Sequence, residues 1–395
     1  MAEKLNTNYK YNIFLTYVKD GVSLDIKSDK LLTIVIEYDY DRKNMPIILL
    51  RAALDKNLID HMISNKNKVI ILNISKYRES ESIQINKTFI QDEFFYILDN
   101  NMSYTEDIDY GRENKDAEDI TRTITIGLVK KDTVLNNKML INTVYSDTSI
   151  LDMICSRFTH TKLVIEPFEN KNIDNMIITP MESLTKFINY IDNEYTLYDT
   201  QYRLFHDFNK SYLLSSSGKG VPTKDEKYNT VYININNTVT KEAKIEGMRE
   251  DKDSKAYIVN IDPSNMHISV DNSTTLSYNE IIAVDSEGNS KTVSLNSDVD
   301  GSRYRITRIN NDNLDKLDNI KNKIDFGKDV ITIMKEQLDS EVFSINKEFY
   351  IHCYDKLKDK NGKYLLVSKK EIYIKEVEGF QMTTILTLKK IPSTY

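Results

Sequence analysis

The chain has 395 residues and a mass of 46.0 kDa, which predicts two or three domains rather than a single core. Its formal net charge is −7. We therefore do not expect a generally basic surface of the kind that binds DNA or anionic lipid. No segment has the roughly 18 uncharged apolar residues that a membrane helix needs. The N-terminus also lacks the uninterrupted apolar segment of a secretory signal, so we expect neither feature.

The cysteine and glycine content narrows the range of chemistry. Cys155 and Cys353 are the only cysteines, and they are too few for a disulfide framework. We expect both to be reduced and structural, as in a protein assembled inside a cell. The chain has 11 glycines, a scarcity that argues against the phosphate-cradling loops of many enzymes.

The first third of the chain is predicted to be mainly β-strand. Residues 31–38 and 69–77 are rich in β-branched and apolar side chains. Residues 120–129 alternate between apolar side chains and threonines, which is the pattern of a half-buried strand. The acidic and polar residues 101–119 predict an exposed loop. A helix over 54–64 is predicted from the spacing of Leu54, Leu58, Ile59, Met62 and Ile63.

The middle of the chain changes character and predicts a small α+β module. Residues 149–158 have helical spacing, and residues 163–168 resemble a short strand. Thr179 can cap a helix, Pro180 suits its first position, and Glu182 completes a capping box. The predicted buried stripe of this helix is Leu184, Phe187, Ile188 and Ile191.

A second β-rich region follows the module. A hairpin is predicted across 202–215, and residues 215–227 form the best candidate linker because they combine Ser, Gly, Pro and charge. One further helix is predicted over 312–324, with Leu314, Leu317, Ile320 and Ile324 on one side. The predicted strands of this region are 229–235, 256–261, 303–309, 347–354 and 382–391.

The two β-rich regions contain two weakly similar sequence segments, a similarity that we call the internal echo. Residues 93–97 resemble 347–351, and residues 125–131 resemble 384–390. A duplication would give one chain two copies of a similar barrel. Chance recurrence of common strand residues is the alternative, and the sequence leaves both open.

Most known sequence motifs for catalysis, metal binding and nucleotide binding are missing. The chain has no H-E-x-x-H, C-x-x-C or G-x-G-x-x-G pattern. Gly218 and Lys219 do not form a Walker loop, because Leu213 stands where the first glycine belongs. Residues 298–301 resemble the start of a calcium loop but lack its regular later ligands, so we interpret them as a solvated turn.

Pairs of reactive side chains are better explained by packing. His352 and Cys353 are neighbours on a predicted strand, so their side chains point to opposite faces, and Cys353 is expected in the core. Cys155 and His160 are five positions apart on a helix and therefore diverge. We interpret both pairs as structural.

His206 and Asp207 could orient a base, but they also alternate on a strand, and no nucleophile is evident nearby in sequence. The 25 tyrosines could stack on sugars or bases, although half-buried strands and subunit interfaces use tyrosine more often. Lysine pairs at strand ends are interpreted as edge protection and solvated rims. These pairs are Lys130-Lys131, Lys369-Lys370 and Lys389-Lys390.

The middle module resembles the baseplate hub proteins of phage tails and related contractile injection systems. It combines a short helix (SILDMICSRF), a strand (LVIEPF), a helical segment and a strand pair that ends in YRLFHDFNKSYLLS. The N-terminal segment MPIILLRAALDKNLIDHMI resembles the first barrel of such hubs. The matching module residues are Ile177, Ile178, Pro180, Met181, Leu184, Ile188, Ile191, Tyr195, Phe205, Asp207 and Tyr212.

This resemblance implies an α+β, mainly β fold with two tube-like antiparallel β-barrel domains and an inserted small α+β module. The implied boundaries are 1–140 for the first barrel, 141–224 for the module, and 225–395 for the second barrel with one helix. It also implies a structural protein that is not an enzyme, with no catalytic, cofactor-binding or metal-binding residues and no cofactor.

The implied assembly is a homotrimer in the virion tail baseplate, built in the host cytoplasm. Two barrels in each of three chains would match a six-fold tail tube or tube-initiator protein on one side. The three-fold ring would accept a central spike protein on the other, with further baseplate proteins around it. DNA would pass through the lumen without specific binding, and an acidic lumen would let it slide.

Two other functions remain open. A tail-associated lysin would append a hydrolase domain to such a hub, and we expect none because the chain ends at Tyr395, directly after the last predicted strand. A receptor-binding or glycan-binding tail component would use exposed tyrosine clusters.

Overall fold

The computed structural model describes the chain with gaps. The predicted loop 101–119, the predicted helix 312–324, His160 and residues 298–301 lie outside the described residues. The described residues are 10–19, 22–41, 44–65, 68–80, 83–98, 121–137, 141–159, 161–181, 183–224, 229–235, 256–270, 280–284, 287–294, 304–308, 329–336, 338 and 340–391.

The largest element of the described part is a 14-stranded mixed sheet to which both ends of the chain contribute. Most neighbours are antiparallel, but β13 pairs in parallel with both β14 and β20, so the predicted purely antiparallel arrangement is wrong there. The strands are β1 (Lys10–Lys19), β2 (Val22–Ile26), β3 (Leu31–Asp39), β4 (Ile47–Asp55), β5 (Val69–Ser80), β6 (Ile83–Leu98), β7 (Thr121–Lys130), β13 (Thr230–Ile235), β14 (Ala256–Ile261), β15 (Met266–Val270), β19 (Asp329–Glu336), β20 (Glu348–Cys353), β21 (Gly362–Lys375) and β22 (Phe380–Lys390).

The strands predicted from β-branched content and alternation are confirmed at 31–38, 69–77 and 120–129. In β3, β4 and β7 buried residues alternate with exposed or half-buried ones, as a sheet with one face on a core requires. Ile34, Leu50 and Ile126 have no exposed surface. Burial of each such side chain stabilises the fold by about 1.5–3 kcal/mol.

The long hairpin of β21 and β22 joins the two β-rich regions. β21 pairs with β20 through its first residues and with β3 through its later ones. β22 pairs with β19 along most of its length and with β1 at Phe380. The pairings β21–β3–β4–β7–β6–β5–β1–β22 therefore return to β21, because β22 also pairs with β21.

The internal echo does not correspond to equivalent strand pairs. In the first region the echoed segments lie in β6 and β7, which are direct neighbours. In the second region they lie in β20 and β22, and β21 separates these two strands. The echo thus reflects similar strand sequences in different positions of the sheet.

The predicted helix over 54–64 is confirmed as α1 (Lys56–Ser64), with two differences. Asp55 caps it by accepting a hydrogen bond from the Leu58 amide at 2.7 Å, and Leu54 belongs to β4. Ile63 is 53% exposed, so its assignment to the buried stripe is wrong. The stripe is narrower than expected because α1 covers the sheet through Ile59 and Met62.

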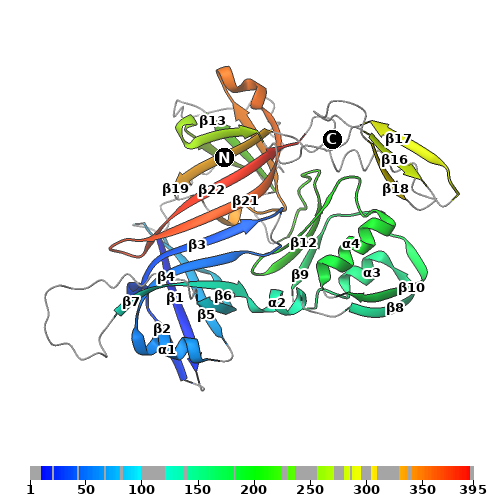
Figure 1. Cartoon of the computed structure of the whole chain (residues 1–395). Coiled ribbons are helices and arrows are strands. Elements are labelled where there is room, and N and C mark those ends of the chain that lie inside the picture. Colours follow the sequence, from blue (N-terminus) through cyan, green and yellow to red (C-terminus); the bar gives the residue numbers. More distant parts are fainter. Residues whose placement is uncertain are drawn as a thin grey trace, which may run out of the picture.

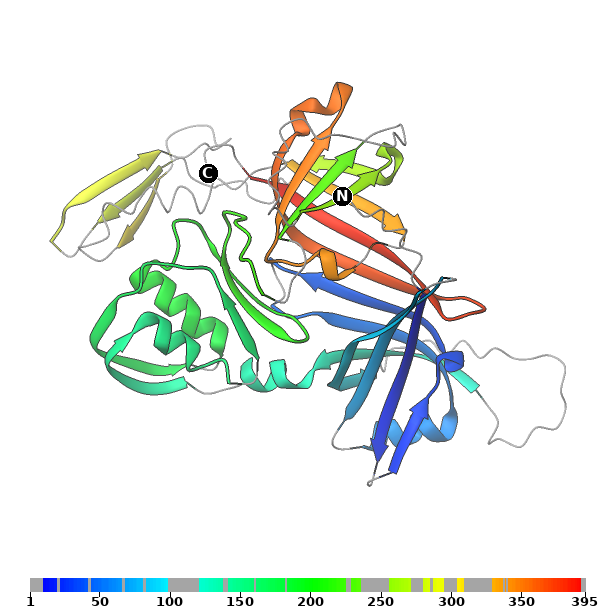
Figure 2. The same ribbon diagram turned by 180° about the vertical axis from the view of Figure 1, so that it is seen from behind.

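The middle module lies to one side of the large sheet (Figure 1), as the view from behind also shows (Figure 2). Its buried helical stripe is confirmed. Its elements are α2 (Lys131–Asn137), β8 (Ile141–Ser149), α3 (Ile150–Cys155), β9 (Lys162–Ile165), β10 (Asn172–Met181), α4 (Leu184–Tyr195), β11 (Tyr202–His206) and β12 (Lys210–Ser215). A separate small sheet holds β16 (Glu280–Val284), β17 (Ser290–Ser294) and β18 (Tyr304–Arg308).

The predicted start of the long module helix is wrong. Thr179 and Pro180 lie in β10, whose pairing with β8 continues to Met181. The helix starts at Leu184 instead, where Ser183 accepts a hydrogen bond from the Lys186 amide at 3.2 Å. A long-range strand pairing therefore overrides a local capping signal. The strand predicted over 163–168 is shorter than expected, because it ends at Ile165.

The sheet of β9, β11 and β12 separates two hydrophobic cores. The predicted hairpin is confirmed, with β11 antiparallel to β12. Phe205 and Tyr212 face the core of the large sheet. Leu204 and Leu213 face the core of the module. One thin sheet thus couples the module to the body of the protein.

The described part of the predicted linker begins with Ser215, the last residue of β12, and residues 216–224 have no helix or strand but are held by hydrogen bonds. The Val221 amide donates to the Asn346 carbonyl at 2.9 Å, and the Asn346 side chain donates back to the Val221 carbonyl at 3.3 Å. Gly218 has a positive φ of 67°, which favours glycine at this turn. The segment is therefore held against the turn that precedes β20.

Candidate functional site

The described residues contain no group of three or more His, Cys, Asp or Glu side chains that could hold a metal ion. None of the helices in the described part combines the length and apolar character that crossing a bilayer requires. The candidate functional features are therefore a buried polar junction and a sheet surface.

The two cysteines have different environments. Cys353 is 1% exposed and packs in the main core, as predicted, and burial raises the pKa of its thiol to about 11. His352 faces the Tyr354 ring at 4.6 Å between centroids. Cys155 is exposed, whereas Ile150, Met153 and Ile154 of the same helix are buried.

His206 has a partner that the sequence analysis missed. Its Nδ1 lies 2.8 Å from Ser211 Oγ, and Ser211 Oγ lies 2.5 Å from Thr161 Oγ1. The hairpin register places His206 directly opposite Ser211, and this register was the signal available in the sequence. Burial lowers the pKa of His206 to about 4, which keeps it neutral. Neither His206 nor Ser211 has any exposed surface, so the pair is a structural link.

A buried charged cluster lies where the module meets the sheet. Lys369 Nζ and Glu371 Oε1 are 2.9 Å apart, and the Tyr373 hydroxyl donates to Glu371 at 2.8 Å. The Lys369 ammonium also lies 4.2 Å from the centroid of the Tyr38 ring. Burial raises the pKa of the module residue Asp207, and Lys369 opposes this shift.

Arg203 crosses the same junction. Its guanidinium donates to the Leu366 carbonyl of β21 at 2.5 Å, and burial lowers its pKa. Beside it, the rings of Tyr40 and Phe205 meet edge to face at 4.5 Å. The His206 amide also donates to the Asn44 carbonyl at 2.7 Å. The module is thus bound to the sheet through backbone, aromatic and charged contacts.

The prediction that both lysines of each lysine pair form solvated rims is wrong. In each pair one lysine is buried and the other is partly exposed. Lys130, Lys369 and Lys389 are buried. Lys130 pairs with Asp92 at 3.2 Å, as Lys369 does with Glu371.

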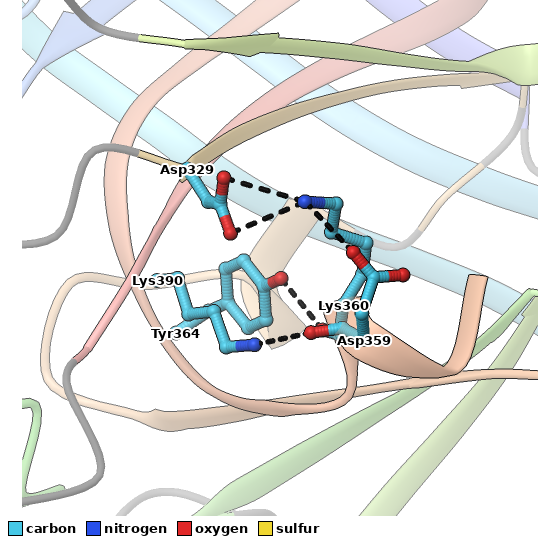
Figure 3. Close-up of polar contacts among 5 residues, drawn as sticks. All are labelled: Asp329, Asp359, Lys360, Tyr364 and Lys390. Atoms are coloured by element: carbon cyan, nitrogen blue, oxygen red, sulfur yellow. Dashed lines mark hydrogen bonds and ion pairs between the residues drawn. The ribbon is translucent and has the colours of Figure 1, made fainter.

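A second polar cluster fixes the end of the C-terminal hairpin. Lys360 Nζ contacts Asp329 at 3.3 Å and Asp359 at 3.1 Å. The Tyr364 hydroxyl donates to the Lys360 carbonyl, and Lys390 donates to the Asp359 carbonyl. Figure 3 shows the Lys360 ammonium between the two carboxylates. The short helical turn Asp355–Lys360 is therefore tied to β19, β21 and β22.

The face of the large sheet that points away from its core carries a continuous apolar row. The register places the row's members opposite one another on five neighbouring strands. Ile97 is 64% exposed and Leu49 is 40% exposed. We name this row the outer band, and its residues on β21, β3, β4, β7 and β6 are Ile372, Val35, Leu49, Gly127 and Ile97.

The surroundings of the outer band carry few unpaired charges. Lys370 and Glu37, next to the band, neutralise each other in an ion pair of 2.9 Å. On the other side the neighbouring row contains Thr33, Arg51 and Thr125, of which Arg51 is exposed. Sequence analysis could not find this surface, because five distant segments build it.

The whole architecture is shared with tail proteins of known structure. The crystal structure of the tail protein from Neisseria meningitidis MC58 has a TM-score of 0.52 and 11% identity, over 97% of this chain and 96% of that one. The 43 kDa tail protein of prophage MuSo2 from Shewanella oneidensis has a TM-score of 0.53 and 10% identity, over 96% and 98%. The Francisella PdpA-VgrG complex matches with a TM-score of 0.50 and 11% identity, over 97% of this chain and 58% of that one.

These likenesses establish the fold of phage tail proteins, so the resemblance stated from the sequence is confirmed at the level of fold. The family model described as Bacteriophage PBS1 gene 109 protein matches residues 1–391, and the chain belongs to that family. Comparison with curated protein sequences finds no match.

Proposed function

We propose that the chain is the structural hub of a phage tail baseplate. The observation that carries this proposal is the extent of the likeness. It covers 96% or more of this chain and of each of the two bacterial tail proteins, so no large part of any of them lies outside the shared fold. The match of the family model to residues 1–391 supports the same conclusion.

The hub is a homotrimeric ring. The closed path of pairings through β3, β4 and β7 supports one tube-like barrel, and the strands around β13 and β20 support a second. Three copies present six barrels to a six-fold tail tube or tube initiator and a three-fold end to a central spike protein. Other baseplate proteins surround the ring, and DNA passes along its axis.

The domain boundaries 1–140, 141–224 and 225–395 suit this arrangement, with one refinement. The hairpin of β21 and β22 belongs to the third segment by sequence, but it pairs with β3 and β1 of the first. The two barrels therefore share this hairpin.

The role is structural rather than enzymatic. The glycan-binding alternative has less support, because many tyrosines among the described residues are buried in the core. The fully buried tyrosines include Tyr11, Tyr17, Tyr96, Tyr364 and Tyr373.

The test is the mass of the purified chain, measured by light scattering behind a sizing column, followed by imaging of tails. A mass near three times 46.0 kDa with a central hole is expected. Antibody labelling should place the chain at the baseplate end of the tail. A chain that is missing from isolated tails would overturn the proposal.

A further inference from the structure

The middle module is joined to the large sheet by two connections of the chain. The chain enters the module through α2, which packs against β6 and β7 of the sheet and against α4 of the module. It leaves the module after β12, through a connection that contains residues 216–224. Figure 1 shows α2 between the sheet and the module. Both connections therefore lie at the junction of the two bodies.

The module has a hydrophobic core of its own. Ile154, Phe187 and Leu213 belong to it and have no exposed surface. A body with its own core can leave its neighbour without unfolding, provided that the contacts across the junction are given up. The buried apolar side chains that cross to the core of the large sheet all come from the β11–β12 hairpin, and they are Phe205, Phe208, Tyr212 and Leu214.

Buried polar atoms without a hydrogen-bond partner gather at this junction. On α2, Thr133 and Asn136 are 1% and 2% exposed. Neither Thr133 Oγ1 nor either polar atom of the Asn136 amide has a partner in the described part of the chain. The same is true of Thr223 Oγ1 in the second connection, and of Arg203 Nε and His206 Nε2 on β11. A polar group that loses water on burial and gains no other bond lowers stability, so the docked state carries a cost at the junction.

Buried polar side chains inside the module are paired by contrast, as two examples show. Glu166 accepts hydrogen bonds from the Ser215 amide at 2.8 Å and from Ser215 Oγ at 2.9 Å. Thr200 Oγ1 accepts a hydrogen bond from the Ser216 amide at 3.0 Å. The unpartnered atoms thus belong to the attachment of the module and not to its interior.

We propose that the module is a releasable part of the protein, which detaches from the large sheet as a folded unit and turns on its two connections. The apolar side chains of the β11–β12 hairpin hold the module in place. The unpartnered polar atoms favour its release, because they regain hydrogen bonds to water when the junction opens. This inference goes beyond the proposed function and does not depend on it.

The test is hydrogen exchange of the purified full-length chain, measured at residue resolution. The His206 amide donates to the Asn44 carbonyl at 2.7 Å, and this bond between module and sheet breaks when the module detaches. Leu50 lies in β4 between β3 and β7, so its amide exchanges only when the sheet itself opens. We expect the His206 amide to exchange faster than the Leu50 amide by roughly ten-fold or more, after correction for intrinsic rates.

A second amide separates detachment from local unfolding. Leu213 lies in β12 between β11 and β9, so its amide stays protected while the module remains folded. Its exchange should therefore be slower than that of His206. Equal exchange of His206 and Leu50 would overturn the inference, because the module would then leave only when the whole fold opens. Equal exchange of His206 and Leu213 would overturn it as well, because the module itself would then unfold.

Thr133→Val and Asn136→Leu test the role of the unpartnered atoms. Each variant removes a buried polar group and nearly keeps its volume, so docking becomes more favourable and exchange of the His206 amide should slow by roughly five-fold or more. The matched control is Thr200→Val, at a threonine that is 4% exposed but has a partner. This variant leaves the Ser216 amide without its acceptor and should not slow exchange at His206.

Faster exchange at His206 in both Thr133→Val and Asn136→Leu would overturn the inference, because it would mean that bound water satisfies these side chains in the docked state. Unchanged exchange in both variants would overturn it too. Failure of the proposed function is a separate result. A chain that is missing from isolated tails would remove the hub proposal and leave these exchange rates as they are.

Discussion

Lys369 and Glu371 form an ion pair of 2.9 Å in which the side chains are only 6% and 0% exposed. They are two residues apart on β21, so both point to the same, inward face of the sheet. The Tyr373 hydroxyl and the Tyr38 ring also contact the pair. This charged pair lies in the strand that connects the two β-rich regions with the module.

Glu371→Gln is expected to lower the free energy of unfolding by about 3–5 kcal/mol. The variant keeps the shape of the side chain but removes the carboxylate charge that pairs with the buried Lys369, and removing one partner is the costly way to break a buried pair. Chemical denaturation followed by circular dichroism measures the change. The control is Lys370→Gln on the same strand, which breaks the half-exposed pair with Glu37 and should cost about 1 kcal/mol or less. Equal effects of the two variants would contradict this account.

Local patterns in the sequence were sufficient where the structure depends on near neighbours. The apolar spacing of Leu184, Phe187 and Ile191 predicted the buried stripe of α4, because a helix brings residues three and four apart to one side. The alternation around Ile124 and Ile126 predicted β7 for a similar reason, since a strand repeats every two residues.

Features made by distant segments were not predictable in this way. Thr179 carries a good capping signal, yet β10 continues past it because β8 pairs with it. Ser211 meets His206 only through the register of the hairpin. The outer band needs five strands in register, and no local pattern marks Gly127 as the centre of that row. Sequence patterns therefore recovered some of the elements, such as β3, β7 and the buried stripe of α4, while the candidate site depends on how the strands pair.

His206 should make the stability of the protein depend on pH between about 6.5 and about 4. Burial lowers its pKa in the folded state to about 4, from 6.5 as the ordinary value. As the pH falls through this window the unfolded state binds the proton first, so the stability present above pH 6.5 is lost. The expected loss at pH 4 is about 3 kcal/mol. Urea denaturation across this range measures it.

The variant His206→Asn isolates this effect. Its amide can still reach Ser211, but it does not titrate, so the slope of stability against pH between about 6.5 and about 4 should be smaller than in the parent chain. Asp207 is unchanged in both proteins, and its raised pKa therefore cancels from the comparison. Identical slopes would show that His206 is not the responsible group.

Phe205→Ala should weaken the attachment of the module to the sheet. The ring is fully buried and meets Tyr40 at 4.5 Å, so truncation leaves a cavity between the two elements. We expect a loss of about 3–5 kcal/mol in the free energy of unfolding. Phe168→Ala is the control, because Phe168 is only half-buried and packs inside the module against Tyr198. Faster hydrogen exchange in β11 for Phe205→Ala alone would locate the effect, and unchanged exchange there would count against it.

Two glycines with nearly the same backbone conformation should respond differently to alanine. Gly379 has φ = 82° and Gly288 has φ = 85°, so both substitutions incur the strain of a left-handed residue, about 1–2 kcal/mol. At Gly379 a Cβ would also lie 2.8 Å from the Tyr11 carbonyl oxygen and from the Tyr77 hydroxyl, whereas nothing lies within 4 Å at Gly288. Gly379→Ala should therefore cost a further 1–3 kcal/mol, roughly the cost of overpacking. Thermal unfolding of the two variants measures the difference. Because the Gly379 turn rests on β1 and β5, equal melting temperatures would mean that the end of the β21–β22 hairpin is not held against these strands.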